Sequence, residues 1–180
     1  MILSDSAILE AMERGEIIIE PFDREALGSN SYDVHLSPHL AVYTEEVLDA
    51  RKENSMRHFE IPEEGFVLQP GELYLGSTIE YTESNAHLPI LDGKSSVGRL
   101  GIDIHATAGI GDVGFRGHWT LEISVTKPVR VYSGMPIGQI IYYVPQGEIL
   151  RPYHSKKNAK YRNQEGKPIG SKMWKNFSSE

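Results

Sequence analysis

The chain has 180 residues, no cysteine and a formal net charge of −7 at pH 7. The lack of cysteine excludes disulfides, thiolate nucleophiles and Cys-ligated metal sites, and the length suits one domain with a sizeable core. The charge is uneven, since residues 1–150 hold 10 Lys or Arg and 23 Asp or Glu, whereas residues 151–180 hold 8 and 2. An acidic body argues against a DNA or RNA partner, because each phosphate contact needs a cation.

No stretch approaches the roughly 20 apolar residues of a membrane span, and the first residues lack the pattern of a leader. We therefore expect a cytoplasmic protein with no membrane contact. The basic segment 151–180 can be a solvated end, a nucleic-acid arm or a lid over a small anion. From Lys156 to Lys175 it is polar and poor in branched apolar residues, which predicts mobility in the free protein.

The first predicted element is a short helix near the start of the chain. Ser4 can cap it, and Gly15 is a natural stop. Ile8, Leu9 and Met12 are expected on its apolar face.

Short β-rich runs separated by glycine and proline follow. In "NSYDVHL", Tyr32, Val34 and Leu36 alternate with polar residues. The other runs are "EIIIEPF", "EGFVLQPGELYLGST" around a Pro70-Gly71 turn, "GIDIHATAG", "HWTLEISV", "PVRVYSG" and "IGQIIYYV". Many short strands at regular spacing predict a mainly β barrel or double sheet rather than a doubly wound α/β fold.

The stretch "GKSSVGRL", which begins at Gly93, nearly matches the phosphate-binding pattern G-x-x-x-x-G-K-[ST]. Arg99 stands where the pattern has lysine, and Leu100 stands where it has the Mg²⁺-binding hydroxyl. A P-loop also needs a following helix whose N-terminus meets the phosphates, and "LGIDIHATAG" reads as strand. The P-loop interpretation therefore fails, which leaves an ordinary turn or a phosphate site of another kind.

The run "HWTLEIS" carries a glutamate in the middle of a predicted strand. Trp119, Leu121 and Ile123 point to one face, and Thr120 and Glu122 point to the other. Glutamate is disfavoured inside strands, so a charge on a solvated sheet face is the plain interpretation. Partial burial in a closed sheet would instead make the carboxylate a useful general base near neutral pH.

The preceding run adds further candidates. Asp103, His105 and Thr107 alternate there, and the small residues 108–111 let a ligand approach the backbone before Asp112. His105 can equally be a structural histidine, and Asp112 can equally be a turn former. No histidine shows H-E-x-x-H spacing, cysteine is absent, and so is the zinc deaminase signature H-x-E…P-C-x-x-C, so we expect no zinc site.

Six motifs in order resemble the dCTP deaminases of the deoxyuridine triphosphatase (dUTPase) superfamily: "DGKSSVGRLG", "HATAG", "GDVGF", "TLEIS", "GMPIGQ" and "RPY…AKYRNQEG". The resemblance runs from "MILSD" to "WKNF". It implies a single domain, 1–180, with a distorted double-sheet or jelly-roll barrel (the dUTPase-like β-clip) and a short N-terminal helix. It also implies a homotrimer with active sites between subunits and a basic C-terminal tail, 151–180, that closes over the nucleotide.

The same resemblance assigns roles to individual residues. It implies that Glu122 is the catalytic base and that Ser95 and Arg99 orient its water. It implies Mg²⁺ bound with the triphosphate, no zinc, and a contact between Asp112 and the sugar. The full set of implied substrate contacts is Lys94, Ser95, Ser96, Val97, Gly98, Arg99, Asp112, Thr120, Leu121, Glu122, Gln139, Tyr153, Lys160 and Gln164.

The leading prediction is zinc-independent hydrolysis of dCTP to dUTP and ammonia, which feeds dUMP and dTMP synthesis. Gly109-Ile110 leans toward relatives that continue to dUMP and pyrophosphate, because purely deaminating relatives tend to carry a His-Arg pair there. A pure dUTPase fits less well, because the Glu122 motif and the tail resemble the deaminase. A non-catalytic dNTP-binding regulatory trimer and a β-trimer with no ligand are the alternatives from other classes.

Overall fold

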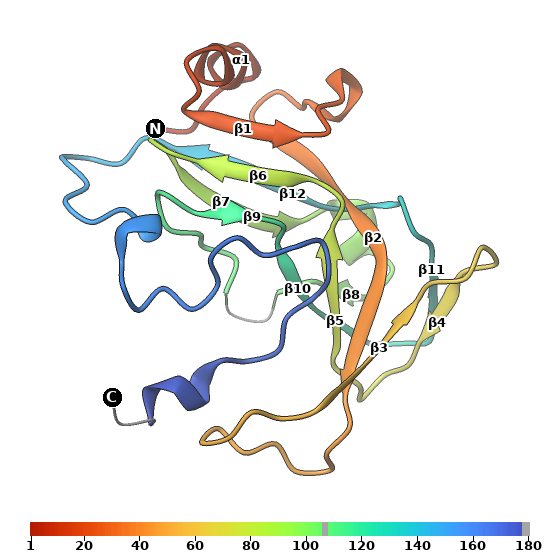
Figure 1. Ribbon diagram of the computed structural model, residues 1–180. Helices are drawn as coiled ribbons and strands as arrows, with labels where there is room; N and C mark the ends of the chain where they lie inside the picture. The colour runs from red at the N-terminus through yellow and green to blue at the C-terminus, as the bar shows by residue number, and fades with distance from the viewer. Residues whose placement is uncertain (106–107, 178–180) are drawn as a thin grey trace.

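The computed structural model describes residues 1–105 and 108–177 (Figure 1). Thr107, part of the alternating pattern above, lies outside the described residues. The elements in chain order are α1 (Asp5–Glu13), β1 (Ile17–Glu20), η1 (Arg24–Ala26), β2 (Tyr32–Tyr43), β3 (Met56–Glu60), β4 (Phe66–Leu68), β5 (Tyr74–Thr78), β6 (Tyr81–Ser84), β7 (Leu88–Gly93), α2 (Ser95–Gly98), β8 (Ile102–Asp103), β9 (Arg116–Gly117), β10 (Thr120–Val125), β11 (Val129–Val131), β12 (Pro136–Tyr143), η2 (Tyr153–Ser155) and η3 (Met173–Asn176), where η marks a 3₁₀ turn.

One antiparallel seven-stranded sheet dominates the molecule. Its order is β7-β12-β2-β5-β10-β8, with β3 also paired to β2. The long strand β2 pairs with β12 through its first residues and with β3 through its last, so it carries the sheet round a curve. The sheets β1-β6-β9 and β11-β4 flank it (Figure 1). The predicted mainly β, barrel-like fold is confirmed.

The core follows the alternation that the sequence predicts. Tyr32, Val34 and Leu36 of β2 are fully buried, and so are Leu121 and Ile123 of β10. Fully burying one aliphatic side chain of this size contributes about 1.5–3 kcal/mol. The inner face of β10 is therefore fixed by packing, which leaves its other face for polar groups.

The predicted N-terminal helix is α1, and its caps are as expected. The Ser4 hydroxyl accepts a hydrogen bond from the backbone N–H of Ala7, at 3.4 Å, and Gly15 ends the helix at φ +67°. The expected apolar face was partly wrong, because Ile8 and Ala11 are the buried pair and Leu9 is only partly buried. Residues three apart share a helix face, which puts Ala11 rather than Leu9 above Ile8. No helix of the described residues is long and apolar enough to cross a membrane.

The segment after β7 differs from the expected turn between strands. It forms the short helix α2, and the following strand β8 covers only Ile102–Asp103 instead of the whole run "GIDIHATAG". Neither Gly93 nor Gly98 has a positive φ, and a Cβ at either position would meet nothing within 4 Å. These glycines are therefore not required by backbone conformation or packing inside one chain.

Candidate active site

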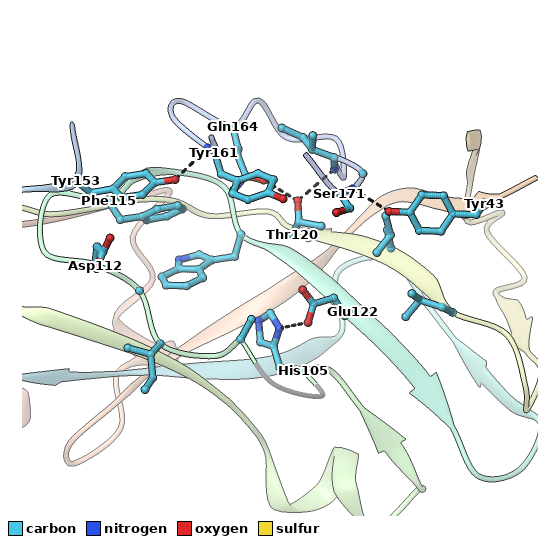
Figure 2. A pocket seen from close by; sticks show the side chains of 18 residues that line it. Tyr43, His105, Asp112, Phe115, Thr120, Glu122, Tyr153, Tyr161, Gln164 and Ser171 are labelled. Carbon is cyan, nitrogen blue, oxygen red and sulfur yellow. Dashed lines mark hydrogen bonds and ion pairs between the residues drawn. The ribbon is translucent and has the colours of Figure 1, made fainter. Parts of the chain in front are cut away.

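A pocket of about 670 Å³ lies between β10, the segment 108–115 and the C-terminal tail (Figure 2). Five of the residues predicted to bind substrate line it, namely Asp112, Thr120, Glu122, Tyr153 and Gln164. They come from a turn, from one strand and from the tail, so the fold gathers groups that are up to 52 positions apart in the sequence.

Glu122 is paired with His105 in the floor of this pocket. The Nδ1 atom of His105 lies 3.2 Å from Oε2 of Glu122, and Figure 2 shows the two side chains pointing at each other. The backbone N–H of Glu122 donates to the carbonyl of Ile104 at 2.9 Å, which ties β10 to the chain just before His105. The histidine side chain is 8% exposed and the glutamate side chain 35%, so the pair is accessible from the glutamate side.

The second ring nitrogen of His105 bears on whether this residue belongs to a functional site. Its Nε2 atom is buried and has no hydrogen-bond partner among the described residues. A buried polar atom without a partner is costly, and such atoms are often found where a ligand or water completes the site. Of the two interpretations that the sequence left open for His105, this contact favours a site residue.

An aromatic wall stands opposite the carboxylate. The rings of Phe115 and Trp119 have centroids 4.5 Å apart, and those of Phe115 and Tyr153 are 6.3 Å apart. Trp119 is held by a hydrogen bond from its Nε1 to Thr82 Oγ1, at 3.0 Å. A Cβ at Gly111 would lie 2.5 Å from the Trp119 ring, so the small residue there makes room for the wall. Flat apolar faces beside a carboxylate suit a planar ligand with polar edges.

The tail lies across this pocket, and the mobility predicted for residues 156–175 stays a prediction. Gln164 is buried, and its Oε1 accepts a hydrogen bond from Thr120 Oγ1 at 2.7 Å. The backbone N–H of His118 donates to the Gln164 carbonyl at 3.0 Å. Gly117 has φ +141°, and a Cβ there would lie 2.7 Å from the Gln164 nitrogen. Glycine is therefore required where the tail meets β9.

Residues 169–171 also line the pocket, and no motif in the sequence predicted this. The Ile169 N–H donates to Thr120 Oγ1 at 3.2 Å, and the Ser171 N–H donates to Tyr43 Oη at 2.8 Å. Tyr43 and Ser171 are 128 positions apart, so no local pattern could have paired them. Phe115 was also missed, although its place in "GDVGF", just after Asp112, was a signal for it.

The second predicted group, Lys94 to Arg99, is not in this pocket. Ser95, Ser96 and Gly98 of α2 are exposed, as is Arg99 at its C-terminal cap, and Val97 is buried. Lys94 forms a partly buried ion pair with Asp33 of β2. Neither Ser95 nor Arg99 lines the pocket that contains Glu122 in this chain, and their catalytic roles stay predictions.

Three other predicted contacts also lie elsewhere. The Gln139 amide is used within the fold, since Oε1 accepts from Ser31 Oγ at 3.0 Å and Nε2 donates to the Gly93 carbonyl at 3.1 Å. Leu121 buries its whole side chain in the core, so only its backbone can face a ligand. Lys160 lines a separate cavity of about 190 Å³ in the tail.

No group of three or more His, Cys, Asp or Glu side chains that could hold a metal ion is found within residues 1–105 and 108–177. Mg²⁺ that is held by the phosphates of a nucleotide does not need such a group of side chains. The binding of Mg²⁺ stays a prediction.

The fold and the pocket together define a barrel-like β protein whose main pocket holds a carboxylate and an aromatic wall. Residues 2–144 match the sequence model of the dCTP deaminase-like family, and the chain belongs to that family. The resemblance seen in the six motifs is thereby confirmed.

Two relatives are similar over most of their length. The chain is 49% identical over 166 residues to the dUMP-forming dCTP deaminase of Clostridium acetobutylicum, covering 92% of this chain and 93% of that protein. It is 51% identical over 166 residues to the dUMP-forming dCTP deaminase of Leptospira biflexa serovar Patoc, covering 92% of each.

A solved structure supports the fold. The 2'-deoxycytidine 5'-triphosphate deaminase from Agrobacterium tumefaciens matches 82% of this chain with a TM-score of 0.64 and 21% sequence identity. This chain spans 49% of the length of that solved chain. At 21% identity, this similarity shows that the two chains share a fold and nothing further.

Proposed function

We propose that the chain deaminates dCTP and carries the product on to dUMP and pyrophosphate. The observation that carries the deamination is Glu122, which faces a pocket of about 670 Å³ with its Oε2 3.2 Å from a buried histidine. The names of the relatives at 49% and 51% identity support the dUMP-forming product. They favour the alternative that Gly109-Ile110 suggested over the dUTP-forming reaction that the sequence placed first.

In the deamination, Glu122 acts as the general base. Its carboxylate takes a proton from a water molecule as the water oxygen attacks C4 of cytosine. The carboxyl group passes this proton to N3 of the ring. It then takes the proton of the new C4 hydroxyl and delivers it to the amino group, so that the C4–N4 bond breaks, ammonia leaves and a carbonyl forms at C4. His105 holds the carboxylate in the orientation that faces the pocket. A positioned base of this kind contributes roughly 10²–10⁴-fold to the rate.

The second reaction is hydrolysis at the α-phosphorus. A water oxygen bonds to that phosphorus, the bond to the bridging oxygen breaks, and pyrophosphate leaves with that oxygen. Mg²⁺, when bound with the triphosphate, neutralises part of its negative charge. The acidic body, with 23 Asp or Glu against 10 Lys or Arg in residues 1–150, makes such neutralisation important for binding.

We further propose that Ser95 and Arg99 act on the Glu122 of a neighbouring subunit in a homotrimer. Both side chains are exposed, on α2 and at its C-terminal cap, and lie outside the pocket of their own chain, which supports this arrangement. Arg99 offers a guanidinium that can stabilise the developing oxyanion, and Ser95 offers a hydroxyl that can orient the water.

Incubation with dCTP and Mg²⁺ tests the proposal. Ammonia together with dUMP and pyrophosphate, separated by chromatography, is the expected result. Ammonia with dUTP alone would support the first product predicted from the sequence, and binding without ammonia would support the regulatory alternative. The substitution Glu122→Gln should lower ammonia release roughly 10²–10⁴-fold. Glu148→Gln, at an exposed loop residue, is the matched control and should leave the rate unchanged.

A further inference from the structure

We propose that Lys156 is a positioning residue for sugar recognition. Its ammonium group fixes the carboxylate of Asp112 at the edge of the pocket, where that carboxylate accepts a hydrogen bond from the sugar hydroxyl of the nucleotide. The inference rests on the proposed function and on the sugar contact that the family resemblance implies for Asp112.

The geometry of the pair is direct. Lys156 Nζ lies 2.8 Å from Asp112 Oδ2, and Asp112 lines the same pocket as Glu122. The Asp112 side chain is 52% exposed, so without a partner it would be free to occupy several rotamers. The contact with Lys156 selects one rotamer and uses one carboxylate oxygen. Among the described residues no hydrogen bond is found to the other oxygen, Oδ1, which is left for a ligand.

Both partners are held by the backbone around them. The Tyr153 N–H donates to the Val113 carbonyl at 2.8 Å, and the Lys156 N–H donates to the Tyr153 carbonyl at 3.1 Å. Gly114, at φ +90°, lets the chain pass so close that a Cβ there would lie 2.8 Å from the Tyr153 nitrogen. The start of the tail is therefore docked on the Asp112 turn, and Lys156 extends from that docked segment.

Aromatic packing further limits the position of the ammonium group. Lys156 Nζ lies 5.8 Å from the centroid of the Tyr153 ring, within the range of a cation–π contact. Tyr153 is itself part of the pocket wall beside Phe115. The cation is thus placed by the same side chain that shapes the sugar end of the pocket.

The chemistry of the ligand explains why this pair matters. In a 2'-deoxynucleoside 5'-triphosphate the 3'-hydroxyl is the remaining free sugar hydroxyl. An ionised carboxylate can only accept hydrogen bonds, so Asp112 selects for a hydroxyl donor. Lys156 therefore favours the orientation of Asp112 that sugar recognition needs.

The test compares dCTP with 2',3'-dideoxycytidine triphosphate, which lacks the hydroxyl. Wild-type protein should prefer dCTP. Lys156→Met should lower kcat/KM for dCTP about 10- to 100-fold, mainly through KM, and should change the value for the dideoxy analogue little, because one charge-assisted hydrogen bond is weakened. Lys156→Arg should restore most of the preference. Lys157→Met, at the exposed neighbouring lysine, is the control and should behave as wild type.

Two outcomes would overturn the inference. Equal losses on both nucleotides would show that Lys156 acts on the shared triphosphate, and unchanged values would show that the ion pair has no role in recognition. Equilibrium binding of both nucleotides to each variant separates this question from turnover. If wild-type protein binds dCTP but releases no ammonia, the proposed function fails, and the ratio of the two binding constants still decides the role of Lys156. If it binds neither nucleotide, both fail.

Discussion

Replacement of Gly117 by alanine is expected to release the tail from the body of the protein. The residue has φ +141°, and an added Cβ would lie 2.7 Å from the backbone nitrogen and 3.2 Å from the carbonyl oxygen of Gln164. Both of these Gln164 atoms belong to the backbone, so rotation of a side chain cannot relieve the clash. The tail must move away from β9 for the methyl group to fit.

The size of the effect follows from the contacts that are lost. Moving Gln164 breaks the hydrogen bond from the His118 N–H, at 3.0 Å, and the bond from Thr120 Oγ1, at 2.7 Å. Two such hydrogen bonds contribute roughly 1–3 kcal/mol in total. That free energy corresponds to about a 5- to 150-fold shift of the tail from docked to undocked. Cleavage of the tail should rise by the same factor where it reports the open population.

Limited digestion with trypsin measures this shift, because the tail contains Lys156, Lys157, Lys160 and Arg162. The control is Gly71→Ala, because Gly71 also has a positive φ, +86°, but a Cβ there meets nothing within 4 Å. It places a Cβ at another positive φ without touching the tail. If tail cleavage were equally fast in wild type and Gly117→Ala, the close approach of Gly117 to Gln164 would not hold the tail, and the reasoning would be wrong.

Two further predictions concern the assembly and the pH dependence of stability. Mixed trimers of inactive Glu122→Gln and Arg99→Ala subunits should regain ammonia release if the sites are shared between subunits. Each variant alone should stay inactive. If the mixture released no ammonia, Glu122 and Arg99 would have to act from the same chain. Hydrogen bonds from the Arg14 guanidinium, and then from His87, lower the pKa of Glu16 to about 2 from its ordinary 4.5. Its stabilising effect is therefore fully present above pH 4.5 and is lost as the pH falls through about 2. The difference in Tm between wild type and Glu16→Gln should shrink over that window, and a constant difference would contradict the assignment.

The sequence predicted those parts of the fold whose pattern is local. The alternation of Tyr32, Val34 and Leu36 defined β2, and "HWTLEIS" placed Glu122 opposite the buried Leu121. Strands β3 and β6 carried no such signal. Their sequences, "MRHFE" and "YTES", are largely polar, and they are strands because they pair with distant partners, β2 for the first and β1 and β9 for the second. Strand propensity depends on such neighbours more than on the residues themselves.

The candidate site was likewise predicted from the sequence only in part. Motif resemblance was sufficient to choose Asp112, Thr120, Glu122, Tyr153 and Gln164, which meet in one pocket. It could not show that Lys94 pairs with Asp33, or that Gln139 bridges Ser31 and Gly93 inside the fold. These pairings depend on which strands become neighbours, and spacing along the chain does not encode that.

The hydrogen bond between Ser171 and Tyr43 bears on the order in which the molecule is made. The barrel core, with β2, β10 and β12, is complete in the nascent chain once Tyr143 has left the ribosome. The pocket wall is complete only when Ser171 has followed and reached a partner 128 positions earlier. Contacts of such long separation form late, because closing a long loop costs entropy before any bond is gained. During synthesis the strands are therefore all present before residues 169–171, which close one side of the pocket, have emerged, so the pocket is completed after the barrel.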